Sequence, residues 1–187
     1  MRIVTASKGA DVVVGAGDFA NARHGLSVCI DVLKAIEIPA VLVPGNNESH
    51  DELLNACRGW KNASVLHGAG IEIQRQAFYG IGGGIPITPF GDWSFDFSEE
   101  QATELLRGCP RGAVLISHSP PKGFVDQSSA GRSLGSTAVL DAVVELQPRL
   151  VVCGHIHASA GERAKVGETL IVNAGPDGVM IELSRGL

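Results

Sequence analysis

The sequence predicts an α/β fold built on a mostly parallel sheet, and two observations carry this prediction. Apolar runs typical of buried strands alternate with segments whose apolar residues recur at helical spacing. Four of the runs also end directly in residues that bind metal ions well. These runs are 12–17 before Asp18, 41–45 before Asn46, 113–117 before His118, and 150–154 before His155 and His157. Ligands of open α/β sheets gather at the carboxyl ends of the strands, so we expect these residues to converge on one site.

The first third of the chain is expected to continue the alternation of strand and helix. Apolar residues recur at helical spacing over 26–36, and the run 40–43 predicts the next strand. Ser49 or His50 can cap a short helix over 51–57, because serine and other short polar side chains hydrogen-bond the unpaired N–H groups of a first turn.

The middle of the chain changes character. Short strands are expected over 63–66, 70–74 and 78–81, and the spacing of the last two predicts an antiparallel hairpin. Residues 82–93 contain four glycines and two prolines, which exclude a helix and predict a long loop. Loops of this length inside compact domains are usually functional.

The remaining elements are two capped helices and two strands. A capping-box spacing predicts a helix over 98–107, and a second serine opens a helix over 136–146. Strands over 169–172 and 179–183 complete the series. Because no repeat, low-complexity tract or linker divides the chain, we expect a single domain over residues 1–187.

Composition narrows the possible functions. A chain of 187 residues that is 44% hydrophobic fits one compact domain. Its net charge of −5 disfavours nucleic acid as a partner, because phosphate backbones are bound through clustered lysine and arginine. No apolar stretch reaches the roughly 18 residues that span a bilayer, and no signal-type segment follows the start, so a cytoplasmic protein is expected. The four cysteines are too scattered to indicate a disulfide framework or a thiolate zinc site.

The start of the chain admits two interpretations. If residues 1–6 formed a strand, only residues 7–10 would link it to the next strand, whereas a parallel crossover needs about a dozen residues. The alternative is that residues 1–8 are the end of a helix, with Lys8 in its last turn and Gly9 just past it. The helical interpretation is favoured.

The ordered strand ends resemble the motif series of the calcineurin-like metallophosphoesterases, and the loop over 82–93 resembles that of small prokaryotic members. The matching motifs are Gly17-Asp18, Gly45-Asn46-Asn47-Glu48, Ser117-His118 and Gly154-His155-Ile156-His157. This resemblance implies a four-layer α/β/β/α sandwich around a site for two divalent metals, where phosphate esters are hydrolysed.

The residue types fit that chemistry. Two metals about 3.5 to 4 Å apart clamp the attacking and leaving oxygens of a phosphoryl transfer and need a bridging carboxylate. We expect Asp18 to bridge, Asn46, His118 and His155 to complete one metal position, and His157 to face the other. Ligands without thiolate favour Mn, Fe, Zn or Ni over Mg or Ca. The leading hypothesis is a phosphohydrolase for small phosphomonoesters or phosphodiesters that acts through a metal-bound hydroxide.

One departure from the family weakens the second metal position. The family's Asp-x-His motif, which follows its first strand, occurs nowhere in this sequence. On the helical interpretation of residues 1–8, the chain starts too late to include that strand, either natively or through a misplaced start codon. The first position is then firmly bound, while the second keeps only Asp18 and His157 and is weak or empty unless His24, Asp92 or substrate oxygens complete it.

A second departure concerns the general acid. Asn47 stands where many relatives have a histidine that protonates the leaving group, and an amide releases no proton at neutral pH. Asn47 is expected to contact a phosphate oxygen instead, and Glu48 is a candidate replacement acid. The alternative hypothesis is a catalytically degenerate protein of the same fold that binds a single metal or a phosphate.

Each candidate also has a purely structural explanation. Asp18 could cap a turn, Asn46 could be a turn former and His118 a buried, hydrogen-bonded histidine, but their joint occurrence favours metal ligation. Arg23 and Arg132 could hold a phosphate, although surface placement is the ordinary expectation. Surface or loop positions are expected for the remaining histidines, His24, His50 and His67.

Overall fold

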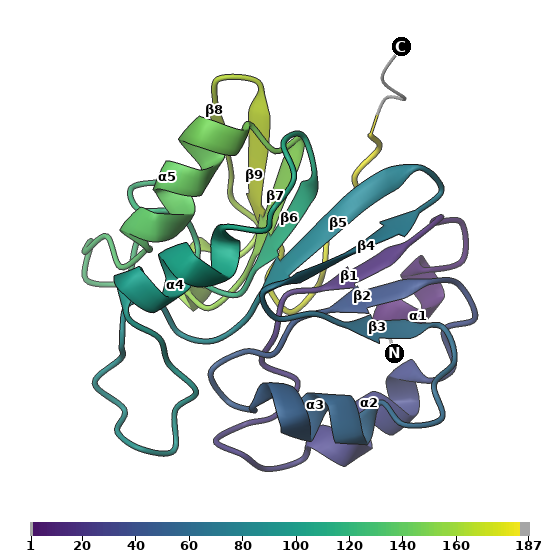
Figure 1. The fold of residues 1–187 in the computed structure, drawn as a ribbon. Helices are drawn as coiled ribbons and strands as arrows, with labels where there is room; N and C mark the ends of the chain where they lie inside the picture. Colours follow the sequence, from purple (N-terminus) through teal and green to yellow (C-terminus); the bar gives the residue numbers. More distant parts are fainter. Residues whose placement is uncertain (1, 184–187) are drawn as a thin grey trace.

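The computed structural model describes residues 2–183, which form two β-sheets with helices on their outer faces (Figure 1). The helices are α1 Arg2–Ala6, α2 Leu26–Leu33, α3 His50–Ala56, α4 Glu99–Leu106, α5 Thr137–Leu146 and the short 3₁₀ helix η1 His157–Ser159. The strands are β1 Val13–Gly15, β2 Ala40–Leu42, β3 Ala63–Val65, β4 Ala69–Ile73, β5 Gln76–Ile81, β6 Val114–Ser117, β7 Leu150–Cys153, β8 Arg163–Val166 and β9 Thr169–Asn173.

The sheets are mostly parallel, as the continuous apolar runs predicted. Strands β1, β2 and β3 form a parallel three-stranded sheet. The second sheet has the order β4-β5-β6-β7-β9-β8, in which the four inner strands are parallel and the two edge strands are antiparallel to their neighbours. The expected hairpin is β4–β5. The carboxyl ends of the parallel strands therefore lie together at one end of each sheet.

Three hydrophobic clusters fill the spaces between four layers. In β2, Leu42 packs towards α2 and α3, while Val41 packs between the sheets. In β6, Leu115 packs towards α4 and α5, while Ile116 packs between the sheets. This alternation is the two-residue period of a strand covered on both faces. It confirms the four-layer α/β/β/α sandwich, with α2 and α3 outside one sheet and α4 and α5 outside the other (Figure 1).

The predicted helix caps are present. The Ser49 hydroxyl accepts from the Glu52 N–H in a capping box, which decides between Ser49 and His50 as the cap of α3. Ser98 forms a capping box with Gln101 at the start of α4, and Ser136 caps α5. Local side-chain chemistry therefore determines where three helices begin.

The two ends of the described chain differ from each other in how well they were predicted. Residues 2–6 form α1, so this segment is helical rather than a strand, as favoured, although the helix ends at Ala6, before Lys8. Residue 1 of the expected segment lies outside the described residues. The strand expected over 179–183 is wrong, since these residues pair with no strand in the described part of the chain. Val179, Ile181 and Leu183 instead pack their side chains against the cluster between the sheets. The alternating apolar residues pack one face of this segment against the core, as in a strand, but the segment forms no strand pairing within residues 2–183.

Strand β8 was not predicted. Its sequence, Arg163-Ala164-Lys165-Val166, is short, lies at a sheet edge and places charged side chains in solvent. It pairs with β9 because the turn at Gly167 and Glu168 brings the two segments into antiparallel register. Among residues 2–183, every helix is too short or too polar to cross a bilayer.

Candidate metal centre

Four strand ends deliver their side chains to one place. Asp18, His118 and His155 follow β1, β6 and β7, and one potential ligand atom of each lies within 4.8 Å of the other two. Asn46 follows β2, and its Oδ1 lies 3.2 Å from His118 Nε2 and 3.1 Å from His155 Nδ1. The predicted convergence of these four residues is therefore present in the folded chain. A backbone hydrogen bond of 3.0 Å from the Gly154 N–H to the His118 carbonyl ties two of the strand ends together.

The hydrogen bonds around this cluster leave acceptor atoms facing one another. Buried His118 places Nδ1 2.7 Å from the Ala16 carbonyl oxygen, which can only accept, so Nδ1 carries the proton and Nε2 faces the cluster. The Asn46 amide nitrogen donates to Ser94 Oγ at 3.0 Å, so Oδ1 points at the imidazoles. Asp18 Oδ1 lies 3.4 Å from His118 Nε2. In a neutral imidazole with its proton on Nδ1, His118 Nε2 has no proton to donate to Asn46 Oδ1 or Asp18 Oδ1. A divalent cation can bind such a group of facing lone pairs.

A network in the long loop over 82–97 fixes the orientation of Asn46. The Ser94 hydroxyl donates to Asp96 Oδ1 at 2.8 Å, while the Thr88 N–H and hydroxyl donate to Asp96 Oδ2 at 2.8 and 2.5 Å. The Phe95 N–H also donates to the Asn46 carbonyl at 3.0 Å. The long loop thus supports a candidate ligand through Ser94 and Asp96. Sequence reasoning missed both residues, since only the length of the loop indicated a function.

Two glycines permit the close approach of the loops that carry Asp18 and Asn46. A Cβ atom on Gly17 would lie 2.5 Å from the Gly45 Cα and 2.6 Å from His118 Nδ1. A Cβ atom on Gly45 would collide with the Asp18 carboxylate and its backbone nitrogen. Real Cβ atoms do not tolerate such contacts, so the loops could not hold these positions with larger residues.

Glu48 joins the loops that carry Asp18 and Asn46 through hydrogen bonds to their backbones. Its Oε1 accepts from the Asp18 N–H at 2.9 Å and from the Gly45 N–H at 2.6 Å, and its Oε2 accepts from the Ala20 N–H at 2.9 Å. The side chain is fully buried, and burial raises the pKa of Glu48 against the opposing effect of these hydrogen bonds. Because both oxygens are engaged with the backbone, the interpretation of Glu48 as the replacement general acid is wrong. Glu48 positions Asp18.

The electrostatic environment gives Asp18 and His155 the protonation states that metal binding requires. Burial raises the pKa of Asp18, but the charge of His118 and hydrogen bonds from Asn47 outweigh it and hold that pKa below its ordinary value. Burial, followed by the charge of His118, lowers the pKa of His155 to about 3. At neutral pH the carboxylate is ionised and this imidazole is neutral.

Asp18 and His155 also share an unusual backbone conformation. Their φ angles are +59° and +62°, in the left-handed region that non-glycine residues rarely adopt. Strain of this kind persists where surrounding structure enforces it and concentrates at functional sites. Glu48 enforces it at Asp18 through the hydrogen bond to the Asp18 N–H.

Apart from Asp18, the residues expected around the second metal position lie outside this group. His157 begins η1 and is exposed, and His24 and Asp92 are exposed as well. The Asn47 side-chain oxygen accepts from the Ala22 N–H at 2.7 Å, and the Asn47 backbone N–H donates to Asp18 Oδ1 at 3.1 Å. Contact between Asn47 and a phosphate, and ligation by His157, stay predictions.

His67 lies in the loop after β3, as expected, but its ring is half-buried rather than solvated. Its Nδ1 accepts from the Gly82 N–H at 3.1 Å, and its ring packs against Phe97 and Phe95 at centroid distances of 4.8 and 5.5 Å. Burial and the neighbouring His50 lower the pKa of His67 to about 4. The residue follows β3, so it belongs to the same end of the molecule as the candidate metal centre.

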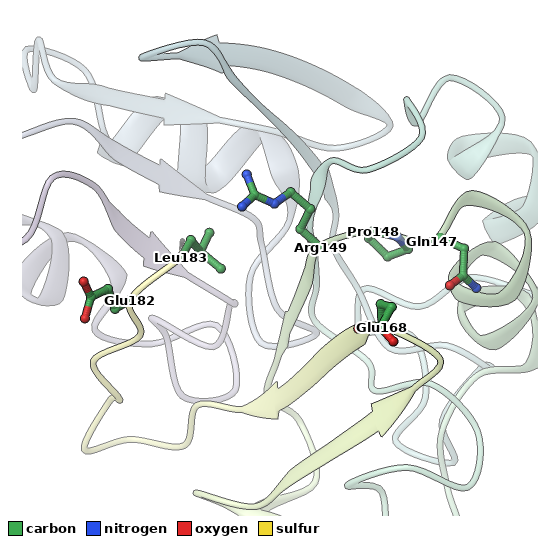
Figure 2. Close-up of a pocket in the computed structure, with 6 residues that line it drawn as sticks. All are labelled: Gln147, Pro148, Arg149, Glu168, Glu182 and Leu183. Carbon is green, nitrogen blue, oxygen red and sulfur yellow. The ribbon is translucent and has the colours of Figure 1, made fainter. Parts of the chain in front are cut away.

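A separate pocket of about 270 Å³ opens elsewhere on the molecule. Figure 2 shows its lining residues, Gln147, Pro148, Arg149, Glu168, Glu182 and Leu183. Arg149 and Glu168 directly precede β7 and β9, so the pocket lies at the amino ends of these strands. It is therefore at the opposite end of the sheet from His118 and His155.

Comparisons with solved structures agree with this architecture. Protein TT1561 of Thermus thermophilus matches with a TM-score of 0.71 at 17% identity, over 94% of this chain and 82% of that one. The sulfate thiohydrolase SoxB from Thermus thermophilus matches with a TM-score of 0.56 at 16% identity, over 95% of this chain and 37% of that one. At these identities the likeness concerns the fold alone.

Comparisons of sequence identify the family. A UPF0046 protein of Caenorhabditis elegans is 29% identical over 88% of this chain and 62% of its own length. Metallophosphoesterase domain-containing protein 1 of Homo sapiens is 34% identical over 71% of this chain. The aligned part covers 39% of that human protein, so this chain spans less than two thirds of either relative. The model of the calcineurin-like phosphoesterases matches residues 1–159, and this chain therefore belongs to the calcineurin-like phosphoesterase family.

Proposed function

We propose that this chain is a metal-dependent phosphohydrolase for small phosphomonoesters or phosphodiesters, formed by one domain over residues 1–187. The observation that carries the proposal is the convergence of Asp18, His118 and His155 within 4.8 Å, with Asn46 Oδ1 between the two imidazoles. Membership of the phosphoesterase family supports hydrolysis as the reaction of such a site.

The chain's own residues have separable roles in this proposal. Asp18, Asn46, His118 and His155 hold one divalent metal firmly, and His157 with Asp18 holds a second weakly. A metal in such a site polarises a phosphoryl oxygen and lowers the pKa of a bound water. Asn47, beside Asp18, contacts a phosphate oxygen.

The donor set also bears on the metal and the substrate. One carboxylate, one amide oxygen and two imidazoles without thiolate suit Mn, Fe, Zn or Ni better than Mg or Ca, and we propose manganese as the first metal to test. The net charge of −5 supports a small phosphoester, since polynucleotides are bound through broad basic surfaces.

The proposal is tested with bis-p-nitrophenyl phosphate in the presence of Mn²⁺. We expect hydrolysis that falls to the buffer rate in Asp18→Ala and His155→Ala. Asp31→Ala is the matched control, since Asp31 is an exposed carboxylate on α2 that pairs with Lys34, and it should hydrolyse like the wild type. A wild-type rate equal to buffer with every divalent metal tried would refute hydrolysis by this chain.

A second candidate function is binding of a single metal or a phosphate without turnover. The exposed position of His157 favours it, since only one metal position is surrounded by several ligands among the described residues. Metal stoichiometry separates the two candidates. One tightly bound metal per chain without hydrolysis supports the binding protein, whereas hydrolysis that saturates with a second equivalent of metal supports the enzyme.

A further inference from the structure

Two aromatic side chains lie exposed on the loop that supports Asn46. Phe90 and Trp93 keep 50% and 39% of their surface accessible, and their rings stack with centroids 5.7 Å apart and planes inclined by 19°. Exposed apolar surface of this size is unfavourable in water, and stacked rings this open are not part of the core. The pair therefore calls for an explanation other than fold stability.

The backbone places the pair next to the candidate metal centre. Trp93 directly precedes Ser94 and Phe95, which hydrogen-bond the Asn46 side chain and carbonyl, both at 3.0 Å. Consecutive Cα atoms are about 3.8 Å apart, so the Trp93 backbone is one residue away from a contact with a candidate ligand. The loop that carries the pair therefore borders the candidate metal centre.

Arg23 holds the Trp93 backbone in place. Its Nε donates to the Trp93 carbonyl at 2.6 Å, and its Nη1 pairs with Glu52 at 2.5 Å. The Arg23 N–H donates to the Asn47 carbonyl at 3.0 Å. The residue has a φ of +70°, so the chain accepts an unfavourable backbone conformation there. The loop after β1 is thus joined to the loop after β2 through the Arg23 backbone N–H, and to the aromatic loop through the Arg23 guanidinium.

We propose that Phe90 and Trp93 form a shelf that stacks against a flat aromatic group esterified to the substrate phosphate. This inference rests on the proposed function, because the phosphate is taken to bind at the centre formed by Asp18, His118 and His155. Arg23 is a positioning residue for the shelf. A flat aromatic group can stack its π-face on the exposed rings of Phe90 and Trp93. An alkyl group has no π-face and would gain less binding energy from this contact. The shared chemistry covers simple aryl groups and nucleobases.

The test measures binding, so that it does not depend on turnover. Calorimetric titrations in the presence of metal compare phenyl phosphate with inorganic phosphate and glycerol 2-phosphate. We expect phenyl phosphate to bind the wild type roughly tenfold more tightly than the other two, as a single stacking contact provides. Adenosine 5′-monophosphate is the second arm. Tighter binding than phenyl phosphate assigns the shelf to a nucleobase, and equal binding assigns it to a simple aryl group; both support the shelf.

Variants separate stacking from general apolar contact. Trp93→Phe keeps an aromatic face and should keep the preference for phenyl phosphate, while Trp93→Leu should lose it and retain the wild-type affinity for inorganic phosphate. Val28→Ala, an exposed apolar substitution on α2, is the matched control and should change neither. Arg23→Ala should weaken phenyl phosphate binding and leave inorganic phosphate binding unchanged.

The outcomes distinguish this inference from the proposed function. Equal affinities for phenyl and inorganic phosphate in the wild type, or an unchanged preference in Trp93→Leu, would overturn the shelf even if the chain hydrolyses phosphoesters. Absence of hydrolysis together with a preference that depends on Trp93 would support the shelf in a binding protein and refute only the enzyme.

Trp93 also provides a direct signal for occupancy. The chain has two tryptophans, and Trp60 is buried with its Nε1–H bonded to the Ile36 carbonyl at 3.1 Å. Quenching by acrylamide therefore reports mainly on Trp93. We expect phenyl phosphate, but not inorganic phosphate, to protect the wild-type fluorescence, and Trp93→Phe to show no such protection. Equal quenching with and without phenyl phosphate at saturation would contradict the inference.

Discussion

The two ends of the six-stranded sheet carry polar side chains of different kinds. At the carboxyl ends, His118 and His155 meet Asn46 and Asp18 in a cluster of acceptors, and the surrounding loops are joined by short hydrogen bonds. At the amino ends, Arg149 lies in an open pocket with Glu168 and Glu182, where both signs of charge occur together (Figure 2). The end with the open pocket is therefore not the end where buried acceptor atoms face one another. In this protein, buried acceptor atoms that face one another indicate the metal centre better than the size of a cavity does.

The largest effect on metal binding and hydrolysis at the carboxyl end is expected from Gly45→Ala. The added Cβ would displace Asp18, and a misplacement of about 1 Å at such a site costs roughly 100-fold. Metal affinity and hydrolysis should both fall by about that factor, measured by calorimetry and with bis-p-nitrophenyl phosphate. Gly154→Ala is the matched control at the same end of the sheet, because its Cβ would lie 3.6 Å from the Ala16 carbonyl, an ordinary contact. Equal behaviour of the two variants would contradict the close packing proposed for the loops.

A pH-dependent stability should originate at the carboxyl end. The pKa of His67 is lowered to about 4 by burial and by His50, while an unfolded histidine takes up its proton near pH 6.5. Between these values the unfolded state binds the proton and the native state does not, so the free energy of unfolding falls as pH falls from about 6.5 to 4. The loss is at most ~3 kcal/mol, since each pKa unit corresponds to about 1.4 kcal/mol and the ring is partly accessible.

Urea unfolding of metal-free protein across this pH range measures the effect. His67→Gln keeps an acceptor for the Gly82 N–H but cannot titrate, so its stability should depend less steeply on pH. Thr103→Ala, which removes an exposed hydroxyl that does not titrate, should leave the slope unchanged. If the free energy of unfolding of His67→Gln and of the wild type depended equally on pH, His67 would not be the source of the pH dependence.

A smaller effect is expected from Ser94→Ala. Removing the hydroxyl frees the Asn46 amide to rotate, and loss of a group that orients a ligand typically costs 10-fold to 100-fold in metal affinity. We expect a decrease of about 10-fold in calorimetric titrations with Mn²⁺. Thr103→Ala, which removes an exposed hydroxyl bonded to the Glu99 carbonyl in α4, is the control. Unchanged affinity in Ser94→Ala would show that Asn46 does not depend on the long loop.

The smallest effect should come from the amino-end pocket. Glu182→Gln and Glu168→Gln alter its charge without approaching His118 or His155. Metal affinity and hydrolysis should stay within about twofold of the wild type, as for surface substitutions in general. A larger change would mean that the two ends of the sheet are coupled.

The sequence was most informative where a local rule and a global requirement coincide. The apolar runs predicted β2, β6 and β7, and the polar residue after each run marked the candidate site, because parallel strands align their carboxyl ends. Ser49, Ser98 and Ser136 marked helix starts, because caps act within one turn.

Features that depend on distant partners were not predictable in this way. The role of Glu48 follows from backbone N–H groups some 30 positions earlier in the chain, at Asp18 and Ala20. The contact between Ser94 and Asn46 joins residues 48 positions apart. Segment 179–183 has the alternation of a strand but lacks a pairing partner among the described residues, and a one-dimensional pattern does not contain that information.

The central claim is that Asp18, Asn46, His118 and His155 hold a divalent metal. Calorimetric titration of metal-free protein with Mn²⁺ tests it most directly, with His118→Ala, His155→Ala and His157→Ala measured alongside the wild type. The account predicts one tight site per chain that is lost in His118→Ala and His155→Ala and retained in His157→Ala. Equal Mn²⁺ affinity in the wild type, His118→Ala and His155→Ala, or no tight site in the wild type, would contradict it.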